Sequence, residues 1–195
     1  MIAAIEDLMT EHRLIERVLW SFETFAVDLS RGADADRVSV SEYAEFFAGF
    51  ADRCHHGKEE DLLFVKMNEQ GFPREAGPIA VMLSDHVEGR KHVAGLATVG
   101  AGSGPLSEEE RATVIAHARG YIPLLTSHIM KEDNVLYPMA LQALPTAEME
   151  KLGRDFEVFE REVMGEDAHE RFHALAEKLI HCYPPDPVKT TPVSS

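Results

Sequence analysis

Two stretches of this sequence each place a histidine four residues before a glutamate: His56 with Glu60, and His128 with Glu132. Residues four apart lie on the same face of an α-helix, one turn from each other. An imidazole and a carboxylate in this arrangement point toward one place, as a transition metal requires of two ligands from a single helix. The sequence therefore predicts a metal site to which two helices each contribute a His/Glu pair.

The spacing of these pairs also arises by chance, so it is weak evidence alone. Three other pairs share it: His12/Glu16, His55/Glu59 and His173/Glu177. The arrangement along the chain strengthens the signal. His12 precedes His56 by 44 residues and His86 precedes His128 by 42, and both earlier histidines stand in an apolar helical stripe. We interpret the chain as two helical hairpins, each contributing a histidine and then a His/Glu pair.

The elements that must position these residues are helices. Apolar residues recur at helical spacing over residues 2–30, 39–70, 78–100 and 107–144, and loop residues separate these segments. Ser107 and Glu110 form a predicted capping box at the start of the fourth segment, and Pro123 should bend it. Long segments with short connections are typical of antiparallel neighbours. The predicted fold is all-α, with an up-and-down four-helix bundle over residues 1–144.

Two additional C-terminal helices are predicted after the bundle. Residues 145–164 and 168–181 have amphipathic patterns, so residues 145–183 are expected to form a helical extension packed on the bundle. His169 and His173 are four apart, but no second element offers partner ligands, and we expect them on the surface. Residues 184–195 contain four prolines and no pattern, which predicts a disordered tail.

Composition narrows the partners and the compartment. The net charge of −15 argues against nucleic acid and anionic membranes, since both attract basic surfaces. Two cysteines cannot make a disulfide framework or a cysteine-rich metal site. The first residues lack a secretory pattern, and no apolar run reaches the ~18 residues that a membrane span needs. We expect a cytoplasmic protein.

The predicted inward donors exceed what one metal ion takes from side chains of this kind. They are four imidazoles and two carboxylates: His12, His56, His86, His128, Glu60 and Glu132. Two metal ions that share two bridging carboxylates fit this set, and the absence of thiolates suits iron, manganese or zinc. The alternative is a bundle whose buried histidines and glutamates pair with one another, but two buried carboxylates without a metal would be costly to desolvate.

The constellation resembles the hemerythrin-like, or HHE cation-binding, domain. The matching segments are 11–12, 56–60, 85–90, 128–132 and 136–138, and the resemblance covers about residues 2–144. It implies two non-haem iron ions with an oxo or hydroxo bridge, held by an up-and-down bundle. The four histidines would be terminal ligands, and Glu60 and Glu132 would be the bridges. The ligand would be oxygen, nitric oxide or peroxide.

One residue departs from the family pattern. Oxygen-carrying hemerythrins place a second histidine four residues after the third-helix ligand, where this sequence has Arg90. Other donors in these helices are expected mainly around the site or on the surface rather than on the metals: Glu16, His55, Glu59, His92, His117 and Tyr121. Besides a protein that binds or reacts with a small ligand, the alternatives are an iron- or oxygen-sensing module acting through a protein partner, a reversible oxygen carrier and an iron store.

Overall fold

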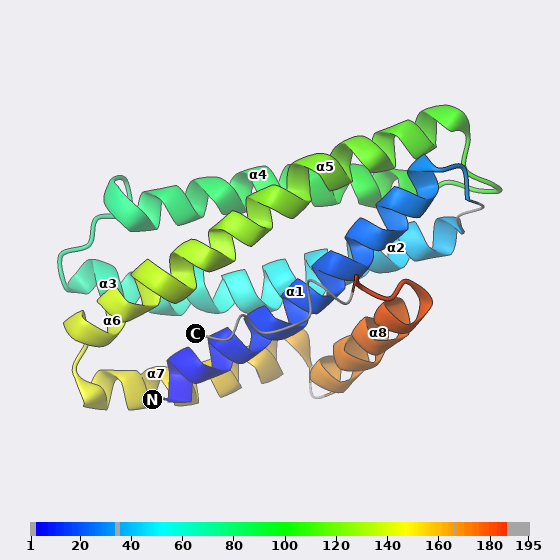
Figure 1. The fold of residues 1–195 in the computed structure, drawn as a ribbon. Coiled ribbons are helices and arrows are strands. Elements are labelled where there is room, and N and C mark those ends of the chain that lie inside the picture. The colour runs from blue at the N-terminus through cyan, green and yellow to red at the C-terminus, as the bar shows by residue number, and fades with distance from the viewer. Residues whose placement is uncertain (1–2, 34–35, 166, 187–195) are drawn as a thin grey trace.

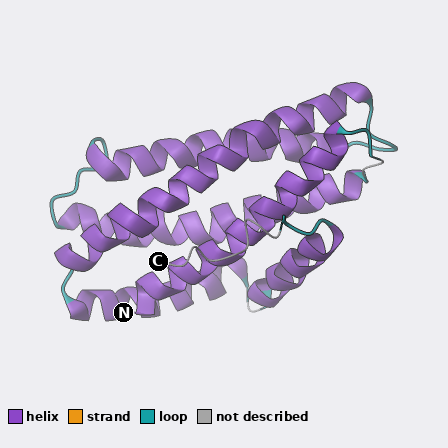
Figure 2. Cartoon of the chain, in the orientation of Figure 1, coloured by secondary structure: helices purple, strands orange, loops and turns teal. Residues whose placement is uncertain are grey.

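The computed structural model describes residues 3–33, 36–165 and 167–186, and helices joined by loops, without strands, make up this part of the chain, which confirms the all-α prediction (Figures 1 and 2). The elements are α1 (Ala3–Ser30), α2 (Arg37–Phe46), η1 (Phe47–His56), η2 (Glu59–Leu63), α3 (Phe64–Glu69), α4 (Gly77–Gly100), α5 (Glu108–Lys131), η3 (Glu132–Leu136), α6 (Tyr137–Ala143), α7 (Thr146–Phe159), η4 (Glu160–Met164) and α8 (Ala168–Cys182). The elements labelled η are π-helical. None of the described helices is long and apolar enough to cross a membrane.

Figure 1 shows long helical stretches beside one another: α1, α2 through α3, α4, and α5 through α6. The backbone stays helical from Arg37 to Glu69, so α2, η1, η2 and α3 form one continuous stretch. Helix α4 packs on α2 and α5, and α1 packs on α5. Helices α7 and α8 both contact α1, and α8 also contacts α2. Most of the predicted tail, residues 187–195, lies outside the described residues.

The ends of the helices follow from local sequence. Ser107 accepts a hydrogen bond from the Glu110 amide, and the Glu110 carboxylate accepts one from the Ser107 amide, which confirms the capping box. Pro78 lies in the first turn of α4, where the missing amide costs nothing. Pro123 lies inside α5, which nevertheless continues to Lys131.

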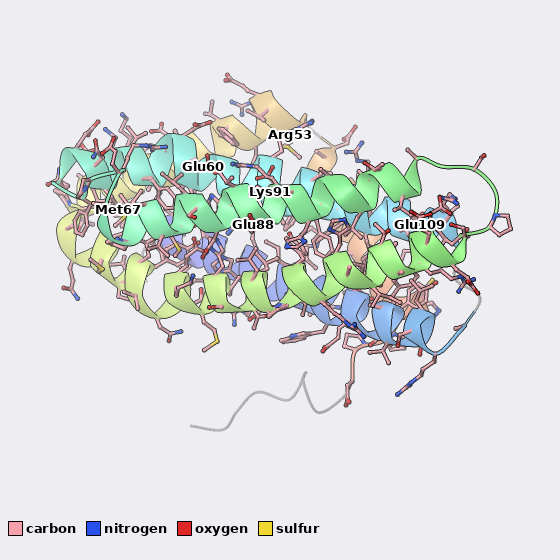
Figure 3. All side chains as sticks on the ribbon, turned by 90° about the horizontal axis from the view of Figure 1, so that it is seen from above. Arg53, Glu60, Met67, Glu88, Lys91 and Glu109 are labelled. Atoms are coloured by element: carbon pink, nitrogen blue, oxygen red, sulfur yellow. The ribbon has the colours of Figure 1, made fainter. Side chains whose placement is uncertain are left out.

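Two apolar clusters fill the interior, and a polar layer separates them. In α1 the cluster around Ile5 and Leu8 ends before His12, and the other cluster begins at Leu14. The same change of cluster occurs in the other three long stretches where their histidines lie. Figure 3 shows side chains filling the space between the helices, with exposed residues such as Glu88 on the outside. The fold thus holds a buried polar layer between two apolar cores.

Arg37 ties the start of α2 to the connection between α4 and α5. Its guanidinium donates hydrogen bonds to the carbonyls of Val99, Gly104 and Pro105 and to the Glu110 carboxylate. We expect Arg37→Met to lower the melting temperature by several degrees because these acceptors lose their charged donor. The same change at the exposed Arg119 is the control and should have little effect.

The ion pair also predicts a pH dependence. The hydrogen bond from Arg37, together with those from Ser107, lowers the pKa of Glu110 from 4.5 to about 2. The folded-state pKa is depressed, so this contribution is present above pH ~4.5 and is lost as the pH falls toward 2. The difference in melting temperature between wild type and Arg37→Met should therefore narrow in acid. A difference that stays constant down to pH 2 would contradict the assignment.

Candidate metal centre

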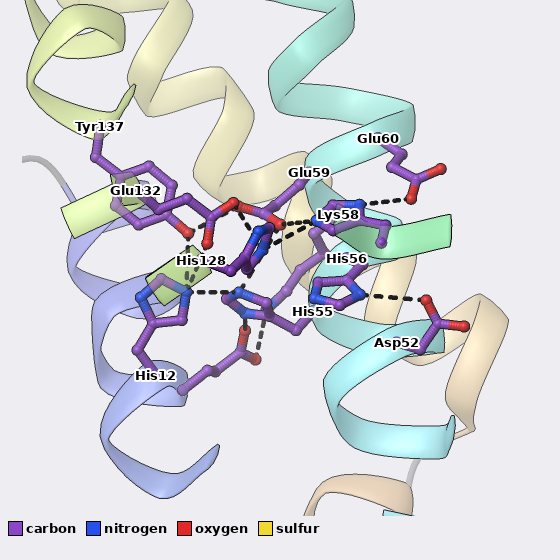
Figure 4. Close-up of polar contacts among 12 residues, drawn as sticks. His12, Asp52, His55, His56, Lys58, Glu59, Glu60, His128, Glu132 and Tyr137 are labelled. Carbon is purple, nitrogen blue, oxygen red and sulfur yellow. Dashed lines mark hydrogen bonds and ion pairs between the residues drawn. The ribbon is translucent and has the colours of Figure 1, made fainter. Parts of the chain in front are cut away.

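Seven side chains of the polar layer form two groups of potential metal ligands (Figure 4). The three-histidine group contains His56, Glu59, His86 and His128, and the two-histidine group contains His12, His55 and Glu132. Within each group the potential ligand atoms all lie within 4.8 Å of one another. All seven residues are buried, with no more than 5% of any residue exposed.

The structure brings five of the six residues predicted as ligands into these groups and leaves Glu60 outside. The Glu60 side chain is 20% exposed, and its carboxylate accepts hydrogen bonds from His86 Nδ1 and from Arg90. The adjacent Glu59 is fully buried and belongs to the three-histidine group. The second long stretch therefore contributes the Glu59 carboxylate to these groups, and the Glu60 carboxylate contacts His86 from outside them.

The difference arises from π-helical backbone. In η1 and η2 hydrogen bonds join residues five apart, as from the Gly57 amide to the Asp52 carbonyl and from the Phe64 amide to the Glu59 carbonyl. Each such turn accommodates an additional residue, so the consecutive His55 and His56 both face the interior. Sequence spacing gave a signal, since His55 and Glu59 are also four apart. Spacing alone could not decide between His55/Glu59 and His56/Glu60, because on a regular α-helix only one of these adjacent pairs can face the interior.

His55, which was not among the four predicted histidines, provides a fifth imidazole to these groups, so five histidines converge although position 90 is an arginine. Arg90 instead pairs with Asp52 and Glu60, the carboxylates that support His56 and His86. The other candidate substitutes, Glu16, His92, His117 and Tyr121, belong to neither group.

Each of the five histidines makes a polar contact between Nδ1 and a carboxylate outside the two groups. The pairs are His12–Asp133 at 2.7 Å, His55–Glu11 at 2.8 Å, His56–Asp52 at 3.2 Å, His86–Glu60 at 2.7 Å and His128–Asp85 at 3.4 Å. An ionised carboxylate only accepts hydrogen bonds, so Nδ1 is the donor in each pair. A neutral imidazole then carries its free lone pair on Nε2, which is the state that a metal ligand requires.

The Nε2 atoms face one another across the polar layer. His12 and His55 approach to 2.9 Å through their Nε2 atoms, and His86 and His128 approach to 3.1 Å. Among the described residues, Glu59 Oε2 and both Glu132 oxygens are buried without a hydrogen-bond donor. Acceptors that face one another without donors are unfavourable unless a cation lies among them. The residues present therefore fit a metal centre.

Without a cation, protons must supply the missing charge. Burial lowers the pKa of His128, but Glu132 and Asp85 outweigh burial and raise this pKa to about 9. Burial and the neighbouring Glu132 raise the pKa of Glu59 well above its usual value. Burial would also raise the pKa of Glu132, but His128 and His12 hold it well below its usual range. Metal ions thus compete with protons for these ligands.

Tyr137 closes the polar layer beside the two-histidine group. Its hydroxyl donates to Glu59 Oε1 at 2.8 Å, and its ring stacks on His12 with centroids 5.4 Å apart. Only one Glu59 oxygen therefore has a protein donor, and the other faces the histidines. The hydroxyl fixes the carboxylate in this orientation.

Comparison with known proteins places this geometry in a family. Residues 3–140 match the model of the hemerythrin HHE cation binding domain. Three proteins described as uncharacterized, one from Mycobacterium bovis and two from strains of Mycobacterium tuberculosis, are each 23% identical over 178 residues, covering 91% of this chain and 68% of theirs. No solved structure matches the chain significantly. Because the family model covers well over half of the sequence, and its cation-binding description agrees with the buried His/Glu groups, this chain belongs to the hemerythrin HHE cation-binding family.

Proposed function

We propose that this protein binds two non-haem iron ions through the seven residues of the two groups and uses them to bind, or react with, oxygen, nitric oxide or peroxide. The observation that carries the proposal is the convergence of five buried histidines on buried carboxylate oxygens of Glu59 and Glu132 that lack hydrogen-bond donors among the described residues. We further propose that the four long stretches form the up-and-down bundle of the family, with α7 and α8 as additions.

Glu59 and Glu132 are the proposed bridges between the two metal ions. Glu132 Oε2 lies 3.2 Å from His12 Nε2, and Glu132 Oε1 lies 3.2 Å from His128 Nε2, so one oxygen faces each group. Glu59 Oε2 lies 3.5 Å from His86 Nε2 and 3.9 Å from His55 Nε2. Both carboxylates thus stand between the groups. Glu59 takes the role that the sequence had suggested for Glu60.

Imidazole and carboxylate donors without thiolate suit iron, and the family resemblance favours iron over manganese or zinc. A pair of iron ions supplies reversible one-electron chemistry and a coordination position for a small molecule. The protein's part is to orient the donors toward one place and to exclude bulk water. The burial of all seven residues restricts access to molecules of a few atoms.

The two groups differ in donor number. With both carboxylates bridging, the three-histidine group offers five protein donors and the two-histidine group offers four. An added small ligand is therefore expected at the side of His12 and His55. This asymmetry supports small-ligand binding at one position rather than storage of many metal ions.

The test uses azide as a probe of the open position. Protein loaded with ferric iron should bind one azide per chain and gain a new absorption band in a titration followed by spectroscopy. Zinc-loaded protein is the control and should show no such band, because zinc has no accessible redox state or partly filled d shell. Failure of the iron-loaded protein to bind azide, or binding of two azides of equal affinity, would contradict an asymmetric site with one open position.

A further inference from the structure

The carboxylates that support the histidines are themselves paired with cations. Asp133 pairs with Arg13, Asp52 and Glu60 pair with Arg90, and Asp85 pairs with Lys131. These three cations are partly exposed, with 55%, 41% and 37% of their side chains accessible. Glu11, which supports His55, pairs instead with Lys58, whose side chain is fully buried. The support of His55 is therefore the one among the five that is shielded from water.

Lys58 connects His55 to the C-terminal part of the chain. Its ammonium donates to Glu11 Oε1 at 2.6 Å, to Glu160 Oε1 at 2.5 Å and to Asp7 Oδ2 at 3.2 Å. Glu160 belongs to η4, which follows the residues matched by the family model. The connection therefore runs from an element outside the common domain to a proposed ligand of the two-histidine group.

The same C-terminal segment packs on the ligand-bearing stretch. The Phe156 ring lies 5.4 Å from the Lys58 ammonium. The Phe159 ring covers Gly57, and a Cβ added to Gly57 would lie 2.7 Å from it. Gly57 and Lys58 lie between the ligands His56 and Glu59, so α7 and η4 hold this turn in place. Any side chain at position 57 would displace the Phe159 ring.

We propose that Glu160, acting through Lys58 and Glu11, is a positioning residue for His55, and that the C-terminal extension thereby tunes the two-histidine side of the metal centre. The effect on the metal rests on the proposed function. The contacts that join Glu160, Lys58, Glu11 and His55 are present whether or not that function is correct. Glu160 touches no proposed ligand and acts only through the two intervening side chains.

The direction of the effect follows from charge. The Glu160 carboxylate partly neutralises the Lys58 ammonium, so Lys58 withdraws less negative charge from Glu11. Glu11 is then a stronger hydrogen-bond acceptor for His55 Nδ1–H. A stronger acceptor makes the imidazole a better donor to a metal. When glutamine replaces Glu160, more of the Lys58 charge falls on Glu11, and His55 donates less electron density. The reduced state of an iron ion at the two-histidine group then becomes more favourable.

The experiment compares Glu160→Gln with two matched controls in the full-length protein. Glu157→Gln removes the same charge from an exposed residue one turn earlier. Phe159→Ala removes packing on Gly57 without changing charge. In iron-loaded protein we expect Glu160→Gln to shift the reduction equilibrium about tenfold toward the reduced state, or about 59 mV for one electron. Glu157→Gln should leave it unchanged, and Phe159→Ala should lower the melting temperature without that shift. Glu160→Asp should restore part of the wild-type potential.

A second readout does not depend on iron. The imidazole nitrogen NMR shifts of His55 in metal-free protein should move in Glu160→Gln, whereas those of His128 should not. If wild type takes up no iron, the proposed function fails while the His55 shifts still decide this inference. Unchanged His55 shifts, or equal changes of potential in Glu160→Gln and Glu157→Gln, would overturn it.

Discussion

Replacing Glu59 by glutamine is expected to remove both metal ions, whereas the same replacement of Glu60 should leave both bound. Glu59 is fully buried, and its Oε2 lies near histidines of both groups without a hydrogen-bond donor. Glutamine keeps the volume but offers one neutral oxygen and two N–H donors, which cannot bridge two cations. The Glu60 side chain is partly exposed, and its carboxylate contacts His86 Nδ1 and Arg90, while its carbonyl accepts a hydrogen bond from Arg74.

The pair of variants is internally matched, because the two residues are adjacent and the chemical change is identical. Metal content measured per chain after gel filtration should fall from two to near zero in Glu59→Gln. In Glu60→Gln it should stay near two, with affinity weakened by about 10- to 100-fold, as is typical for a residue that supports a ligand. The opposite outcome, with metal lost only in Glu60→Gln, would restore the assignment made from helical periodicity alone.

Removal of the metal ions should lower the stability of the whole fold. The ligands come from α1, the α2–α3 stretch, α4 and the α5–α6 stretch, so the centre links all four long helical stretches. Without metal, the buried oxygens of Glu59 and Glu132 remain without donors unless protons are taken up. At a free metal concentration of ~100 times Kd the linkage is worth about 2.7 kcal/mol. For a chain of this length that corresponds to roughly 5–11 °C in melting temperature.

Calorimetry of metal-loaded and chelator-treated protein measures this difference. The Glu59→Gln variant is the control, since a protein that loses both metal ions should melt at the same temperature with and without chelator. Equal melting of loaded and metal-free wild type would mean that the ions do not bind in the buried layer between the two apolar cores.

Much of the architecture could be predicted from local sequence. Turn residues, the capping box at Ser107 and helical apolar stripes indicated the helical segments, and the recurrence of one histidine in each stripe indicated a common polar layer. Five of the six ligands that were predicted from the sequence lie in that layer. These features depend on interactions within one helix or on a pattern that recurs in all four long helical segments, and both can be recognised in the sequence.

The remaining features depend on backbone geometry and on contacts distant in sequence. The π-helical turns of η1 and η2 bring His55, His56 and Glu59 to the interior together, and no residue type in the sequence predicts a π-helical turn. Arg90 suggested that a histidine ligand was missing, because the family pattern places that histidine on the third helix. In this structure the fifth histidine, His55, comes from the second long stretch instead. The contact between Lys58 and Glu160 joins residues 102 apart, and no local pattern indicates such a contact.

The central claim is that this chain holds two iron ions through five histidines and two glutamates. The most direct measurement is metal analysis of protein from iron-supplied cells, combined with Mössbauer spectroscopy of the same sample. We expect two iron ions per chain and a magnetically coupled pair, with unequal environments for the three-histidine and two-histidine sides. A single ion per chain, or a single tetrahedral zinc ion, would contradict the claim.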